Sequence, residues 1–141
     1  MYFIAPLITA LLFLSAGLFI FLKNKRSEVN FAYFLLCFAT FGWQFSWVIL
    51  FAFDSKVNAG ILVRIGYSFI VFIPVAYFHF VTAFLKEKQK AWLFGVYFVG
   101  AIFELLVWYT NYLVDGYYRY FWGYYPKAGL LHPTYLFFAA V

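Results

Sequence analysis

The stretch GILVRIGYSFIVFIPVAYFHFVTAFL, residues Gly60–Leu85, decides the fold of this chain. It is mostly apolar, and it exceeds the roughly 20 residues that an α-helix needs to cross a bilayer. It also contains one arginine, one proline and one histidine, namely Arg64, Pro74 and His79. We therefore predict a transmembrane helix whose polar side chains need partners inside a helical bundle.

Three other segments are long and apolar enough for the same structure: Tyr2–Leu22, Asn30–Phe53 and Ala91–Leu113. The connections are short, so neighbouring helices should be antiparallel. A fifth apolar run covers residues 132–141 and is too short to cross a bilayer at about 1.5 Å per residue. We predict an all-α fold: one domain over residues 1–141, a polytopic transmembrane bundle of four complete helices and a truncated fifth.

The composition supports lipid as the surrounding solvent. Of the 141 residues, 67% are hydrophobic and 11% are charged, whereas soluble domains have about 25% charged residues. The net charge of +5 does not indicate nucleic acid, because six of the ten basic residues lie in two short loops. They are Lys23, Lys25, Arg26, Lys86, Lys88 and Lys90. Basic loops face the cytoplasm, which predicts a multi-pass protein of the cell's inner (plasma) membrane with its N-terminus outside.

Two charged side chains fall inside the predicted helices. A charged carboxylate such as Glu104 costs about 2.5–3.5 kcal/mol near the centre of a membrane helix, so it needs a partner, water or a proton. Arg64 enters from the outer side of the neighbouring helix and could form an ion pair with Glu104. Alternatively, its side chain could extend to the membrane surface. Pro74 cannot donate a hydrogen bond to the Ile70 carbonyl, so it is a candidate hinge.

The predicted outer loop, residues 114–131, is unusually aromatic. Its central part holds seven Tyr, Phe and Trp residues, Trp122 among them, in nine positions around Arg119. Gly123, Pro126 and Gly129 should break the segment into turns. One interpretation is a segment lying at the membrane surface, where Trp and Tyr are enriched. The other is an aromatic lid over a cavity between the helices, with Arg64 and Glu104 beneath it.

Four pieces of the chain together resemble the N-terminal seven-transmembrane region of bacterial sensor histidine kinases. They are the residues Arg64-Ile-Gly-Tyr67, Phe72-Ile-Pro74 and Phe78-His-Phe80, and the run FWGYYPKAGLLHP at residues Phe121–Pro133. The resemblance implies a membrane-embedded sensory input module that detects a small-molecule or membrane signal. It also implies a cytoplasmic output domain, and a homodimer formed through C-terminal parts that this chain lacks.

These arguments give one set of candidate residues and two classes of function. For a sensor, the signal-site candidates are Arg64, Tyr67, Glu104, Trp108 and Trp122, with Pro74 as the hinge. For part of a small transporter or channel, Glu104 and Arg64 would form an intramembrane ion or solute site. A plain membrane anchor is a third possibility. No catalytic, metal-binding or cofactor motif occurs, so we expect no enzymatic activity, metal or cofactor.

Overall fold

The computed structural model describes residues 1–52, 56–86 and 90–140, and within these ranges it has five helices and one antiparallel strand pair. The elements are α1 (Ile4–Lys23), α2 (Glu28–Ala52), α3 (Lys56–Phe84), α4 (Lys90–Tyr109), β1 (Val114–Tyr120), β2 (Gly123–Ala128) and α5 (His132–Ala140). The predicted all-α class is confirmed. Among the described residues, four helices are long and apolar enough to cross a membrane, which indicates a membrane protein.

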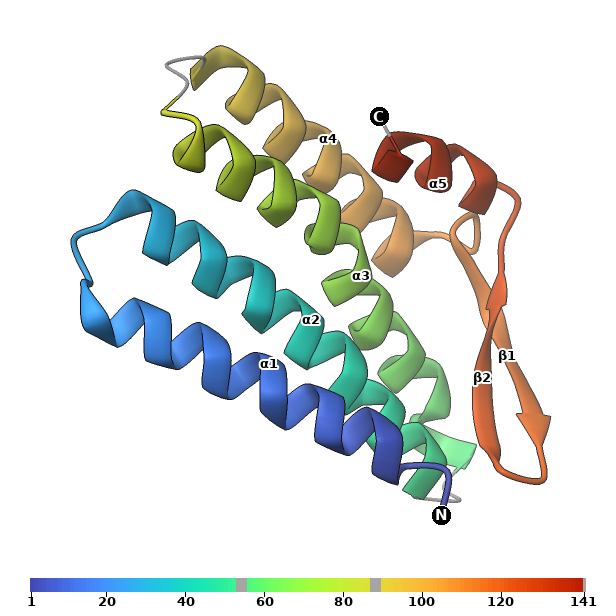
Figure 1. Ribbon diagram of the computed structural model, residues 1–141. Helices are drawn as coiled ribbons and strands as arrows, with labels where there is room; N and C mark the ends of the chain where they lie inside the picture. Colours follow the sequence, from blue (N-terminus) through green and yellow to red (C-terminus); the bar gives the residue numbers. More distant parts are fainter. Residues whose placement is uncertain (53–55, 87–89, 141) are drawn as a thin grey trace.

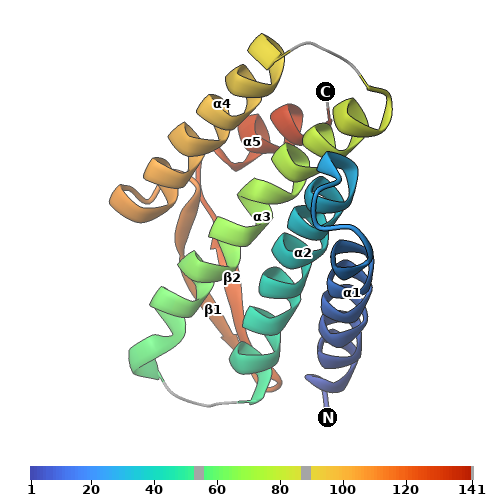
Figure 2. The same ribbon diagram turned by 90° about the vertical axis from the view of Figure 1, so that its left-hand side faces the viewer.

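Helices α1 to α4 form an antiparallel row in which each packs beside its chain neighbour (Figures 1 and 2). We call the end that carries the N-terminus, the end of α2 and the tip of the β-hairpin the hairpin end. The opposite end, with the α1–α2 turn, is the loop end. The hairpin runs along α3 and reaches the last turn of α2. Segments from both halves of the chain therefore meet at the hairpin end.

Small residues let the first two helices approach each other closely. A Cβ atom built on Gly17 of α1 would lie 2.7 Å from the Cβ of Cys37 on α2. Ala10 and Ala32 are fully buried. Membrane helices gain their association energy from van der Waals contact rather than from the hydrophobic effect, so small residues are favoured at such interfaces.

Residues 114–131 depart from the sequence prediction, because most of them form a β-hairpin and not a series of turns. Tyr118 pairs with Tyr125, Tyr120 pairs with Gly123, and the ladder is irregular between Val114 and Tyr117. Tyrosine and phenylalanine fit a pleated, half-buried surface well, which favours strands here. Gly123 has a φ of +135°, and a Cβ atom on it would lie 2.7 Å from the Leu50 carbonyl oxygen. Only glycine allows the hairpin to lie this close to α2.

Helix boundaries shift at two places that matter for the site. Helix α4 ends at Tyr109 instead of Leu113, and α3 begins at Lys56 instead of Gly60. Helix α3 has 29 residues and α4 has 20, so α4 stops short and the hairpin occupies the space beside the rest of α3. The expected end of the second helix, residue 53, and the end of the chain, residue 141, lie outside the described residues.

The largest buried cluster lies where α3, the end of α4, the hairpin and α5 meet. Tyr135 of α5 enters this cluster with 4% of its surface exposed. Its hydroxyl donates a hydrogen bond of 2.8 Å to the Ile70 carbonyl oxygen of α3. Because Pro74 has no N–H, this carbonyl has no donor from its own helix. Helix α5 therefore supplies the hydrogen bond that Pro74 removes from α3.

Candidate functional site

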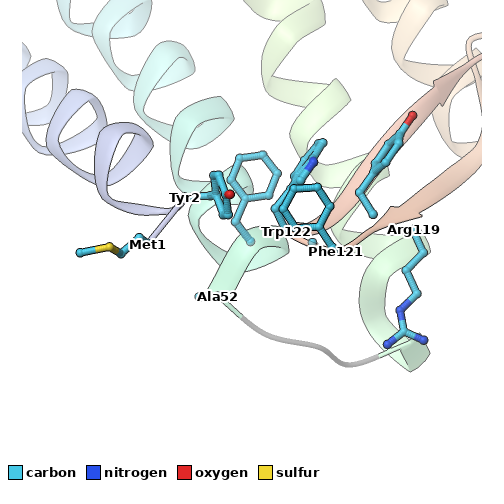
Figure 3. A pocket seen from close by; sticks show the side chains of 9 residues that line it. Met1, Tyr2, Ala52, Arg119, Phe121 and Trp122 are labelled. Carbon is cyan, nitrogen blue, oxygen red and sulfur yellow. The ribbon is translucent and has the colours of Figure 1, made fainter.

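A pocket of about 560 Å³ opens at the hairpin end (Figure 3). Three parts of the chain build it: the N-terminal residues before α1, the last turn of α2 and the tip of the hairpin. Its lining residues are Met1, Tyr2, Phe51, Ala52, Arg119, Tyr120, Phe121, Trp122 and Gly123. Pockets of this size accommodate small-molecule ligands in many proteins.

Trp122 organises the aromatic side chains around this pocket. Its ring stacks on Tyr120 with a centroid separation of 4.8 Å and an interplanar angle of 4°. The edge-to-face contact with Phe51 measures 5.2 Å, and Tyr2 lies 6.4 Å away. Such aromatic pairs contribute about 0.5–1.5 kcal/mol each beyond the area they bury. Trp122 therefore links the N-terminal segment before α1, α2 and the hairpin around one ring.

Arg119 is the charged side chain among the nine residues that line the pocket. In Figure 3 its guanidinium is drawn over the first turn of α3, on the opposite side of Trp122 from Tyr2. The site combines aromatic walls with one charged side chain.

A second hollow of about 510 Å³ adjoins the first along α1 and α2. It is lined by Tyr2, Ala5, Pro6, Thr9, Trp43, Gln44, Trp47, Phe51 and Trp122. Tyr2, Phe51 and Trp122 border both spaces. From Tyr2 to Thr9 the hollow follows α1 for about 10 Å at 1.5 Å per residue.

Arg64 does not form the ion pair with Glu104 that was one of its two expected roles. Arg64 instead donates hydrogen bonds to the carbonyl oxygens of Val107 and Thr110, the latter at 3.0 Å, and to the Asn111 side chain at 2.8 Å. The physical reason is that α4 ends early. The last carbonyls of a helix lack intrahelical donors and carry partial negative charge, so the guanidinium caps α4 at the base of the hairpin.

Glu104 has its partner on its own helix. Its Oε1 accepts a 2.9 Å hydrogen bond from the Trp108 indole N–H, which also lies 3.0 Å from the Ser68 hydroxyl oxygen of α3. Its other oxygen, Oε2, is buried without a hydrogen-bond partner. Glu104 and Trp108 thus form a polar contact between α3 and α4.

The structure divides the predicted site residues into two groups. Trp122 lines the pocket at the hairpin end. Arg64, Glu104 and Trp108 join α3 to α4, and Tyr67 is buried in the core with its ring 5.8 Å from that of His132. None of these four lines either hollow described above. The hairpin tip lies against Tyr2 and the last turn of α2, so it is not a lid over Arg64 and Glu104.

Sequence reasoning missed two residues of the site, Tyr2 and Phe51, and one residue of the core, Tyr135. Tyr2 and Phe51 lie at the ends of apolar segments, where aromatic residues are common, so nothing in the pattern distinguished them. Tyr135 could have been found, because the Ile70 carbonyl left free by Pro74 requires a donor from elsewhere in the chain. Comparison with protein-family models, curated proteins and solved structures gave no match to this chain.

Proposed function

We propose that this chain is the membrane-embedded sensory input module of a signal-transduction protein, and that its signal binds in the pocket at the hairpin end. The observation that carries the proposal is the construction of that pocket. A ligand there would contact the residues just before α1, the last turn of α2 and the hairpin tip at once. It could therefore change how the hairpin sits against the first two helices.

The hairpin connects the pocket to the last helix. Two backbone hydrogen bonds extend the pairing beyond the base of the hairpin: the Gly129 N–H donates to the Leu113 carbonyl at 2.9 Å, and the Leu131 N–H donates to the Tyr112 carbonyl at 2.8 Å. Helix α5 follows at once and is bonded to α3 through Tyr135 and Ile70. Arg64 of α3 also donates a hydrogen bond to the Asn111 side chain, next to the base of the hairpin. A ligand that prefers one hairpin position would thus shift the population of α3 and α5 arrangements.

The proposed orientation follows from charge. Lys23, Lys25 and Arg26 surround the α1–α2 turn at the loop end. The positive-inside rule puts this end in the cytoplasm. The pocket would then face the outside of the inner membrane, where an external signal arrives. The resemblance to sensor histidine kinases supports the same arrangement.

Transport is the second candidate, and one observation favours it. Glu104 Oε2 is a buried carboxyl oxygen without a partner, and intramembrane carboxylates often carry protons or ions. Uptake of protons or cations by liposomes containing the full chain, abolished by Glu104→Gln, would support transport and overturn the sensory proposal. The control is Glu28→Gln at the exposed start of α2.

The sensory proposal is tested without knowing the signal. Tyr2 and Phe121 both line the pocket and are in edge-to-face contact, with ring centroids 6.0 Å apart. In a Cys37→Ala background, the Tyr2→Cys/Phe121→Cys protein is joined by a short bis-maleimide in nanodiscs, as a substitute for a bound ligand. Hydrogen exchange of α5 and of the Pro74 region is then compared before and after crosslinking.

We expect crosslinking to change exchange in α5, and we expect Tyr135→Phe to suppress that change because it removes the bond to Ile70. A protein with one of the two cysteines, treated in the same way, controls for the reagent. Changes confined to α1, α2 and the hairpin would overturn the proposal, because the pocket would then be uncoupled from the rest of the bundle.

A further inference from the structure

The turn between α1 and α2, at the loop end, concentrates positive charge. Lys23, Lys25 and Arg26 lie within four positions, and all three side chains are exposed. Among the residues that the structure describes, none of the three has an ion-pair partner. The nearby carboxylate of Glu28 lies instead 4.0 Å from the His79 Nε2 atom of α3. The turn therefore offers three positive charges to a molecule outside the chain.

Polar side chains hold this turn in a defined shape. The Asn30 side-chain amide donates hydrogen bonds to the Ile20 carbonyl oxygen at 2.9 Å, in the last turn of α1, and to the Asn24 carbonyl oxygen at 3.4 Å. The Asn24 side-chain oxygen accepts a 3.2 Å hydrogen bond from the Arg26 backbone N–H. The Ser27 hydroxyl oxygen accepts one of 3.3 Å from the Asn30 backbone N–H. An anion can therefore bind here without the cost of ordering the backbone first.

The three cations lie at the level of the lipid headgroups. Helix α1 has 20 residues and ends at Lys23, so at about 1.5 Å per residue it spans about 30 Å, the thickness of the hydrocarbon layer. Phe19 and Leu22, just before the turn, are 60% and 59% exposed and face acyl chains in a bilayer. The Lys23 ammonium lies 4.6 Å from the centroid of the Phe19 ring, so positive charge and apolar surface adjoin.

We propose that the α1–α2 turn binds an anionic phospholipid of the surrounding membrane. Its phosphate would lie beside Lys25 and Arg26, and its acyl chains would lie along Phe19 and Leu22. A guanidinium can bind a phosphate in a bidentate manner. This inference goes beyond the proposed function and does not depend on it.

Two features favour a lipid with net negative charge over other ligands. Phosphatidylcholine carries a cation in its own headgroup, which the three positive charges repel, whereas phosphatidylglycerol carries none. Clusters of Lys and Arg next to a membrane helix attract anionic lipids, and each cation strengthens binding about fivefold. An acidic protein segment or a free phosphate would use the cations alone, whereas a phospholipid also uses the exposed apolar side chains before them.

The test compares two lipids with the same acyl chains. The full chain in detergent micelles receives equal amounts of phosphatidylglycerol and phosphatidylcholine, and native mass spectrometry counts the lipids that it retains. We expect preferential retention of phosphatidylglycerol. In phosphatidylcholine nanodiscs, a phosphatidylglycerol with a diazirine near its headgroup should label residues 19–28. Equal retention of the two lipids, or labelling that avoids this segment, would overturn the inference.

Substitutions of exposed side chains locate the site. Arg26→Gln should lower the affinity for phosphatidylglycerol about fivefold, whereas Arg26→Lys keeps the charge and should lower it less. Lys127→Gln is the matched control, because it removes one cation from the hairpin, away from the α1–α2 turn (Figure 1), and it should bind as the wild type does. If Lys127→Gln weakens binding as much as Arg26→Gln, net charge explains the preference and the turn is not the site.

Two competitors identify the kind of anion. Soluble glycerol phosphate has the phosphate without acyl chains, so it should displace the labelled lipid far less than excess phosphatidylglycerol does. Equal displacement would make the turn a site for free phosphate. Binding of polyglutamate at the turn without binding of phosphatidylglycerol would indicate an acidic protein partner. Either result would overturn the lipid assignment.

Discussion

The α1–α2 pair and the α3–α4 pair are held together in different ways. The first depends mainly on close contact at Gly17 and Cys37 and on apolar rings such as Phe21 and Phe34, stacked 5.2 Å apart, with one hydrogen bond of 2.9 Å from Asn30 to the Ile20 carbonyl oxygen near the loop end. The second is crossed by polar contacts along its length. They are Arg64 to the end of α4, Ser68 to Trp108, and His79 to Tyr97 at 2.9 Å.

The difference indicates which helices can move. Close steric fit has one low-energy arrangement, because packed interfaces resist gradual deformation. Hydrogen bonds between side chains and carbonyls can exchange partners at modest free energy. We therefore expect α1 and α2 to act as a frame, and α3, α4 and the hairpin as the part that responds to a ligand.

The largest effect is expected from a substitution that removes the polar contact between α3 and α4 at the hairpin end. Arg64→Met leaves the last α4 carbonyls without their charged donor and should lower the free energy of unfolding by about 3 kcal/mol. Unfolding by SDS in mixed micelles, followed by circular dichroism, measures the loss. Exchange of residues 107–114 should rise as well. Lys127→Met, which removes an exposed cation from the same hairpin, should do little; an equal loss there would contradict the assignment.

The next largest effect is expected from a substitution that disturbs the close contact between α1 and α2. Gly17→Val places side-chain atoms against Cys37 and should cost about 2 kcal/mol by overpacking. Gly95→Val on α4 is the matched control, because a Cβ atom there meets nothing within 4 Å. The same SDS titration compares them. If Gly17→Val and Gly95→Val lower the free energy of unfolding equally, helix propensity alone explains the result. Close packing of α1 against α2 would then not be what holds this pair together.

A smaller effect tests the link between α5 and the proline of α3. Tyr135→Phe removes one hydrogen bond to the Ile70 carbonyl and should cost about 1 kcal/mol. In a Pro74→Ala background the alanine N–H can satisfy that carbonyl, so the same change should cost much less. The double-mutant cycle in free energy of unfolding measures the coupling. Strict additivity would show that the two residues act independently.

The smallest effect is a pH dependence at the start of α5. Burial lowers the pKa of His132, and the titratable side chains whose rings lie against it are Tyr67 and Tyr135. The undocked form therefore binds a proton more readily than the docked one. Docking of α5 is fully favoured above the ordinary histidine pKa of about 6.5 and weakens as pH falls below it. Exchange of α5 should rise on acidification, and His132→Gln should remove most of the rise.

Hydropathy predicted the helices because lipid leaves a long apolar segment few alternatives. It could not predict where α4 ends, because Thr110 and Asn111 only weaken the helical preference and no Pro or Gly stops the helix before Leu113. The hairpin was missed because its tyrosines suit a membrane surface and a strand equally well. The polar residues were identified correctly as unusual, but their partners depended on that early end: Arg64 bonds to backbone that the sequence placed inside a helix.

The short α4 also has a consequence for the lipid beside it. At about 1.5 Å per residue, its 20 residues span about 30 Å, roughly the thickness of the hydrocarbon layer, whereas the 29 of α3 span well beyond it. Strand edges with unpaired amides cannot face acyl chains. Because α4 matches the layer and α3 exceeds it, α3 must tilt or extend beyond the layer beside the hairpin, a hydrophobic mismatch. Membrane thickness itself thus becomes a force acting on the junction of α4 and the hairpin.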